Sequence, residues 1–269
     1  MRLGASPFAS DRATALAIAH DLVAAGIDTL WLGDGILHRP DFAGWCGGLE
    51  SLTELAWLAG RLPSARVGMT AAVLPLRDIE WLAREAATLD HLTEGRFVLA
   101  VAAGFWDDEI RHRGIDPAQR GEEFRTRLAT LRELLAGGPL APFPLTPGGP
   151  PIWLAGRVPT MRLALELGLP YQASRALPDE LAPIATRWFD AGGSLLAHRI
   201  FIEAGDDVPE GLQLARHVLS GSPAALADGL ARYHELGVGD CSLMLGHDDR
   251  SARQTLDVLA TKVLPDLGW

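Results

Sequence analysis

The sequence contains one lysine, Lys262, and two cysteines, Cys46 and Cys241, among its 269 residues. A single lysine near the end of the chain argues against a Walker-type phosphate loop and against Schiff-base chemistry. The cysteines lack C-x-x-C spacing, and the first ten residues contain no apolar segment of the kind that a secretory leader requires. These absences predict a cytoplasmic protein with two free thiols.

Long apolar runs and basic clusters are absent as well. No apolar run approaches the ~18 residues that a membrane span requires, so no membrane partner is expected. The formal net charge is −10, and the arginines are scattered among acidic residues, which argues against nucleic acid as a partner. Hydrophobic residues make up 48% of the chain, which is enough for a large buried core.

The motifs of several common enzyme sites are also missing. There is no H-E-x-x-H and no Cys/His cluster, so no metal site is predicted; Asp108 and His112, four residues apart, are the alternative as a ligand pair. There is no G-x-S-x-G and no G-x-G-x-x-G, which argues against a hydrolase nucleophile elbow and a Rossmann dinucleotide site.

A recurring unit predicts the fold. An amphipathic helix ends at a glycine and a short apolar strand follows, as in LVAAGIDTLWLGD (22–34) and YHELGVGDCSLML (233–245). Alternating strand–helix pairs without a linker predict a single (β/α)8 TIM barrel that spans residues 1–269. The expected strands lie near residues 2–6, 27–33, 66–73, 96–102, 151–155, 169–174, 197–203 and 240–245.

One strand end in this barrel has the features of a phosphate site. AGRVPT (155–160) leads from the fifth strand into a helix, and the first N–H groups of a helix attract anions. Arg157 and Arg175 follow neighbouring strands, and both could bind the same phosphate beside Thr160. An ordinary capped helix is the alternative interpretation.

The segment TEGRFVLAVAAGFWDDEI (93–110) combines a predicted strand with aromatic and acidic residues. Phe105, Trp106 and Phe8 beside small residues leave room for a flat ring, although packing between strands and helices explains aromatics equally well. We interpret the DDE triplet as the first turn of a helix, where the dipole favours carboxylates. The small residues are Ala71, Ala72, Ala102 and Ala103.

Residues 67–135 resemble the bacterial luciferase-like flavin monooxygenases and oxidoreductases. The similarity consists of Leu-Pro-Leu-Arg after a strand, a pattern similar to LA..AA.LD.L..GR, a strand followed by glycine and an aromatic residue, and a stretch similar to E....G.....R..RF. WLAGRVPTMRLALELGLPYQAS (153–174) resembles the flavin-phosphate segment of the family. The resemblance implies a (β/α)8 barrel that holds a flavin at the carboxyl ends of its strands.

The resemblance also assigns cofactor-binding positions. They are Ala71 and Ala72 at a third-strand bulge, Ala103 and Trp106 at the rim after the fourth strand, Gly156, Arg157 and Thr160 in the phosphate cradle, and Ser174 and Arg175 at the sixth-strand contact. The helices expected at 50–60 and 78–92 resemble the dimer face of the family, so a homodimer is expected.

The chemistry that the resemblance implies is oxidation of a small organic substrate by reduced FMN and O2, with a flavin reductase as a supplier of reduced flavin. His38, Asp34 and Glu109 are the candidate catalytic residues, as proton donors or stabilising groups. Ala102 and Ala103 stand where luciferases carry Cys and Arg, so long-chain luciferase activity is not expected.

Two other interpretations of the same resemblance stay open. Coenzyme F-420 is the alternative cofactor; it would transfer hydride without O2, and Arg39, Arg157 and Arg175 could bind its anionic tail. A flavin-binding homologue without catalysis is the other, because Ala102 and Ala103 replace reactive groups.

Overall fold

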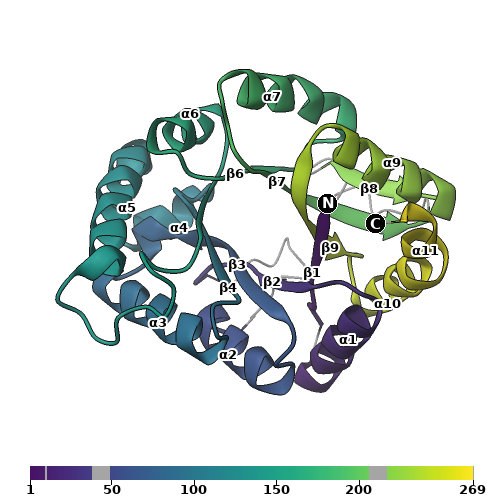
Figure 1. Ribbon diagram of the computed structural model, residues 1–269, viewed down its shortest axis with the longest axis horizontal. Coiled ribbons are helices and arrows are strands. Elements are labelled where there is room, and N and C mark those ends of the chain that lie inside the picture. Colours follow the sequence, from purple (N-terminus) through teal and green to yellow (C-terminus); the bar gives the residue numbers. More distant parts are fainter. Residues whose placement is uncertain (10, 38–48, 206–216, 269) are drawn as a thin grey trace. The chain divides into compact units, whose positions relative to one another are not determined.

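Strands and helices alternate along the chain, and the named strands pair in parallel (Figure 1). The computed structural model describes residues 1–9, 11–37, 49–205 and 217–268. The fold class is the (β/α)8 barrel predicted from the repeated helix–glycine–strand unit. The described residues divide into two compact units. The first comprises residues 1–9, 11–31, 156–205 and 217–268, and the second comprises residues 32–37 and 49–155.

The first unit is built from the two ends of the chain. Its strands are β1 (Arg2–Ser6), β2 (Thr29–Leu32), β6 (Tyr171–Ser174), β7 (Leu196–Ala204), β8 (Val218–Gly221) and β9 (Val238–Leu245). Its helices are α1 (Arg12–Ala24), α6 (Val158–Leu167), α7 (Pro178–Asp190), α9 (Pro223–Glu235), α10 (Asp249–Val258) and, after a π-helical turn at Leu259–Val263, α11 (Leu264–Leu267).

Strand β7 organises the sheet of the first unit. It pairs with β9 along most of its length, with β6 at its start and with β8 at its end, while β9 also pairs with β1 and β1 with β2. The eight predicted strands are all present. Strand β8 is a ninth that the pattern did not reveal, because its four residues VLSG include only two large apolar side chains.

A glycine makes room for the largest side chain in this core. Trp31 in β2 is fully buried, and a Cβ on Gly4 of β1 would lie 2.3 Å from the indole Nε1. No side chain larger than hydrogen fits at position 4, so the glycine lets the indole cross the neighbouring strand.

The second unit contains three strands and four helices of the described chain. They are α2 (Ser51–Arg61), β3 (Arg66–Val73), α3 (Ile79–Leu92), β4 (Phe97–Ala102), α4 (Asp107–His112), α5 (Arg120–Gly137) and β5 (Ile152–Ala155), with 3-10 turns at Leu74–Leu76 and Pro117–Gln119. Strand β4 lies between β3 and β5.

Strand β3 carries the irregularity that the family resemblance implies. Met69 pairs with Leu99 and Ala72 pairs with Val101, so two residues of β3 lie opposite one residue of β4. The peptide bond Thr70–Ala71 within this bulge is cis. The helical turn expected for DDE is also present, as the start of α4.

Candidate functional site

A buried ion pair holds the segment that follows β2. The side chains of Asp34 and Arg77 are 1% and 14% exposed, and their closest contact is 2.6 Å, from Arg77 Nη2 to Asp34 Oδ1. Arg77 Nε and the Val73 N–H donate to the other oxygen at 3.1 and 2.9 Å, and the Gly35 N–H donates to Oδ1 at 3.0 Å. The Asp34 carboxylate thus accepts from four donors, which suits a residue that holds the backbone after β2 in position.

Glu109 anchors the same segment from α4. Its side chain is buried, and its Oε1 accepts the backbone N–H groups of Ile36 at 2.7 Å and Leu37 at 3.1 Å. Asp34 and Glu109 therefore fix both ends of residues 34–37, immediately before His38. The third catalytic candidate, His38, lies outside the described residues, as does Arg39.

The small residues expected beside a flavin ring lie at the ends of β3 and β4. Ala72 is fully buried within the bulge, and Ala71 and Ala103 are half-buried. Trp106 is half-buried and occupies the N-cap position of α4, whereas Phe105 is 63% exposed. This edge of the second unit thus combines small side chains with an indole, which suits contact with a flat ring.

Gly156 and Thr160 form a close-fitting turn at the start of α6. A Cβ on Gly156 would lie 2.4 Å from Thr160 Oγ1, so only glycine lets the hydroxyl lie against the backbone. Gly156 donates its N–H to Gln172 O at 3.2 Å and accepts from Tyr171 Oη at 2.7 Å, which ties the turn to β6. Arg157 is exposed beside it.

Two arginines lie together where β6 and β7 pair. Ser174 lies opposite Arg199, and the N–H of Arg175 donates to Arg199 O at 2.9 Å, with Arg175 in the left-handed region at φ 61°. Burial, and secondarily the charge of Arg175, lower the pKa of Arg199 to about 9. An anion bound here would offset both effects.

Sequence reasoning singled out Arg175 and missed Arg199. The signal was a cation inside the mostly apolar strand LAHRIFIEA, since an arginine within such a strand usually has a bound partner. It also missed a pair formed by Glu203 and His247, whose side chains meet at the ends of β7 and β9.

Other conspicuous groups of the first unit belong to its core. His198 is fully buried, its Nε2 lies 2.9 Å from Ala176 O, and its ring packs on Tyr233 at 4.8 Å. Burial raises the pKa of the Cys241 thiol well above its usual range, so this cysteine is unreactive.

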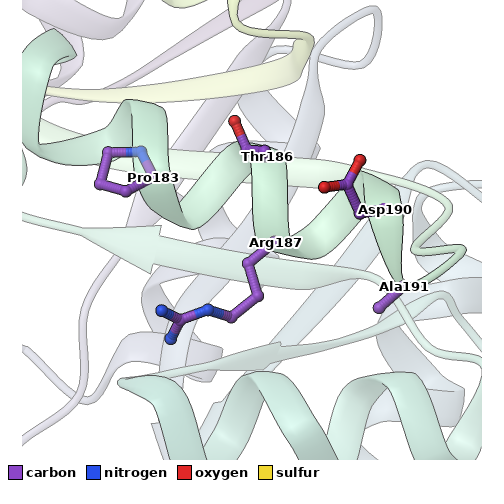
Figure 2. A pocket seen from close by; sticks show the side chains of 5 residues that line it. All are labelled: Pro183, Thr186, Arg187, Asp190 and Ala191. Atoms are coloured by element: carbon purple, nitrogen blue, oxygen red, sulfur yellow. The ribbon is translucent and has the colours of Figure 1, made fainter.

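The hollow shown in Figure 2 is not a candidate for the functional site. It is lined by Pro183, Thr186, Arg187, Asp190 and Ala191, all on α7 or directly after it. Since α7 leads toward the start of β7, this hollow lies at the opposite end of the helix from the carboxyl end of β6. We interpret it as an open surface feature.

Within the part of the chain that the structure describes, no group of three or more His, Cys, Asp or Glu side chains is arranged to hold a metal ion. None of the described helices has the length and apolarity needed to cross a bilayer.

Comparison with known sequences identifies the family. The family described as luciferase-like monooxygenase matches residues 2–194, which is well over half of the chain. The chain belongs to the luciferase-like monooxygenase family. This confirms the resemblance that was based on the motifs of residues 67–135.

Two relatives within the luciferase-like monooxygenases share part of this sequence. The 4-hydroxyprotoasukamycin monooxygenase of Streptomyces nodosus subsp. asukaensis is 36% identical over 124 residues, which cover 45% of this chain and 32% of that protein. The oxygenase component of the flavin-dependent trigonelline monooxygenase of Acinetobacter baylyi is 29% identical over 149 residues, covering 50% and 40%. The matches thus span less than half the length of these relatives.

Solved structures show the same fold at low sequence identity. Monooxygenase RslO1 from Streptomyces bottropensis has a TM-score of 0.81 at 16% identity, with 99% of each chain covered. The oxygenating constituent of 3,6-diketocamphane monooxygenase from Pseudomonas putida, in complex with FMN, has 0.75 at 17%, again with 99% of each covered. An F420-dependent secondary alcohol dehydrogenase has 0.77 at 16%, with 99% and 98% covered.

Proposed function

We propose that this luciferase-like monooxygenase uses reduced FMN and O2 to oxidise a small organic substrate. The observation that carries the proposal is a set of groups in the first unit that suit an anion, namely the Gly156–Thr160 turn at the start of α6 and the Arg175–Arg199 pair where β6 and β7 pair. The flavin-dependent relative and the FMN complex of a structural neighbour support a flavin as the ligand.

The residues at this site fit a flavin phosphate. Gly156 lets Thr160 Oγ1 lie against the backbone of the turn, and the start of α6 presents the positive end of a helix dipole. Arg175 and Arg199 repel each other, so a phosphate dianion would stabilise the charged forms of both.

When bound, reduced flavin would supply two electrons to O2. The chain itself would bind the phosphate, support the ring and shield it from water. Asp34 and Glu109 would hold residues 34–37, immediately before His38 in the sequence, in a fixed conformation. This division of roles follows from the hydrogen bonds that both carboxylates already accept.

The variant Thr160→Ala/Arg175→Ala should weaken FMN binding by more than tenfold. It removes a hydroxyl donor and a charged donor, each worth roughly 1 kcal/mol or more to a phosphate. Titration of flavin fluorescence measures the affinity for FMN and for riboflavin, which lacks the phosphate. Riboflavin affinity should change little.

The matched control for this prediction is Thr186→Ala/Arg187→Ala on α7, at the hollow of Figure 2. It removes the same two residue types from the same unit and should leave FMN affinity unchanged. Equal FMN affinity in the site variant and the control would overturn the phosphate assignment.

A second candidate is hydride transfer with coenzyme F-420. The fold likeness to the F420-dependent secondary alcohol dehydrogenase favours it, and the exposed Arg157 could bind a longer anionic tail. Fluorescence titration with each cofactor, followed by substrate oxidation with and without O2, separates the two. Turnover without O2 in the presence of F-420 alone would favour this candidate over the first.

We also propose a homodimer formed through α2 and α3. In support, Trp81 and Leu92 of α3 are 60% and 59% exposed, which is unusual for large apolar side chains on a helix. Sedimentation equilibrium of the whole chain measures the assembly directly, and a concentration-independent mass of 28.8 kDa would contradict the dimer.

A further inference from the structure

A glutamate and a histidine form a hydrogen-bonded pair where β7 and β9 end. Glu203 is the next-to-last residue of β7, and the residue as a whole is 4% exposed. Its Oε2 lies 3.0 Å from His247 Nδ1. Ile202 lies opposite Leu245 in the parallel pairing, so both members of the pair follow the last paired positions. Barrels of this class place their reactive groups at these carboxyl ends.

The backbone around His247 is fixed on both sides. Gly246 has φ +61° and donates its N–H to Ile202 O at 2.9 Å, and a Cβ there would lie 2.3 Å from the Ala252 nitrogen. Only glycine allows this tight exit from β9. The N–H of His247 donates to Ser251 Oγ at 2.7 Å, at the start of α10. These main-chain contacts hold His247 in place independently of its side chain.

The two nitrogens of the imidazole have different surroundings. Nδ1 faces the buried carboxylate of Glu203, whereas Nε2 lies 3.7 Å from Asp248 Oδ2, which is longer than a hydrogen bond. The His247 side chain is 27% exposed, and that of Glu203 only 6%. A buried carboxylate that orients one nitrogen of a partly exposed imidazole is the arrangement found in acid–base histidines.

We propose that His247 is an acid–base residue of the flavin reaction and that Glu203 is its positioning residue. The proposal rests on the function proposed above. When substrate is present, the reactants are substrate, reduced flavin anion, O2 and one proton, and the products are oxidised flavin, oxygenated substrate and water. In this reaction the O–O bond breaks and one new bond joins oxygen to the substrate. Without substrate, the same reactants give oxidised flavin and hydrogen peroxide, with the O–O bond retained. In both, His247 Nε2 gives up the proton and recovers it from solvent.

The reaction without substrate tests the role of His247, because it needs only protein, reduced FMN and O2. His247→Ala should slow flavin reoxidation in stopped flow by about tenfold or more, since general acids typically contribute 10²–10⁴. Added imidazole should restore part of the rate. The FMN affinity of the variant, measured by fluorescence, should remain that of the unaltered protein.

The chain offers a matched control in His217→Ala. His217 also pairs with a carboxylate, Nδ1 lying 2.7 Å from Glu180 Oε2, but both side chains are about half exposed. This variant should reoxidise flavin at the unaltered rate and respond to no imidazole. A reoxidation rate in His247→Ala equal to that of His217→Ala would overturn the assignment.

Glu203 is tested in the protein without flavin, by nitrogen-15 spectra of the histidine rings. The neutral imidazole of His247 should carry its proton on Nδ1, and Glu203→Gln should increase the tautomer protonated on Nε2, while Glu180→Gln should not affect His247. An unchanged His247 tautomer in Glu203→Gln would overturn the positioning role. Circular dichroism melts confirm that each variant is folded.

The outcomes separate this inference from the function on which it rests. A protein that binds no FMN overturns the proposed function and the assignment of His247 together. Normal FMN binding and O2-dependent reoxidation, with no effect of His247→Ala, overturn only the assignment.

Discussion

Replacing Arg77 with Met is expected to destabilise the protein by about 3–5 kcal/mol, which is the usual cost of removing one partner of a buried ion pair. The substitution keeps much of the side-chain volume but leaves the Asp34 carboxylate, 1% exposed, without its charged partner. Burial alone would lower the pKa of Arg77, yet its hydrogen bonds and charge interactions with Asp34 and Glu50 raise it above the usual value. The pair is thus strongly coupled in the folded state.

Urea unfolding followed by circular dichroism measures this effect. Arg111→Met is the control, since Arg111 is 59% exposed and pairs with the exposed Asp107 and Asp108 of its own helix, so its loss should cost no more than about 0.5 kcal/mol. Neutralising the carboxylate in Asp34→Asn/Arg77→Met should recover part of the stability. Equal urea midpoints for Arg77→Met and Arg111→Met would contradict the prediction.

Acidification from about pH 6.5 to pH 4 is expected to remove about 3 kcal/mol of stability through His198 alone. Burial lowers the pKa of His198 to about 4, against 6.5 for an exposed histidine. In that window the unfolded chain binds a proton that the folded chain does not, so the free energy of unfolding falls as the pH falls. Below pH 4 both states are protonated and the loss is complete.

His198→Gln isolates this contribution. Glutamine cannot titrate, and its amide can still donate to Ala176 O, although the packing on Tyr233 is lost. The variant should be less stable than the unaltered protein at pH 7.5, and the difference should shrink by about 3 kcal/mol at pH 4. His112→Gln, at an exposed position, is the control. Urea midpoints that run parallel for His198→Gln and the unaltered protein would show that His198 does not carry this pH dependence.

Local patterns predicted the elements because each has a local physical cause. Asp78 accepts the Trp81 N–H at the start of α3, and Ser222 caps α9 before Pro223, so capping residues in the sequence mark helix starts. The apolar run 97–102 became β4 and the acids after it became α4. Strand β8 was missed because its formation depends on pairing with β7, and a local sequence pattern does not record such pairing.

The site was predicted less completely than the fold. Gly156 and Thr160 do lie together, and Asp34 and Glu109 do hold one segment, but their roles as catalytic or cofactor-binding residues stay predictions. The contacts among these groups join residues far apart in sequence. Arg77 is 43 residues from Asp34, and Glu109 is 73 residues from Ile36.

The sequence by itself determined the alternation of strand and helix, the (β/α)8 class and the luciferase-like monooxygenase family, because periodicity, capping and ordered motifs are local properties of the chain. Only the tertiary structure decided which charges meet. Arg175 lies beside Arg199, and Glu203 contacts His247, which is 44 residues away in the sequence. Both proximities follow from which strands end side by side. Strand neighbours depend on how the whole sheet buries its apolar faces, and no single segment encodes that.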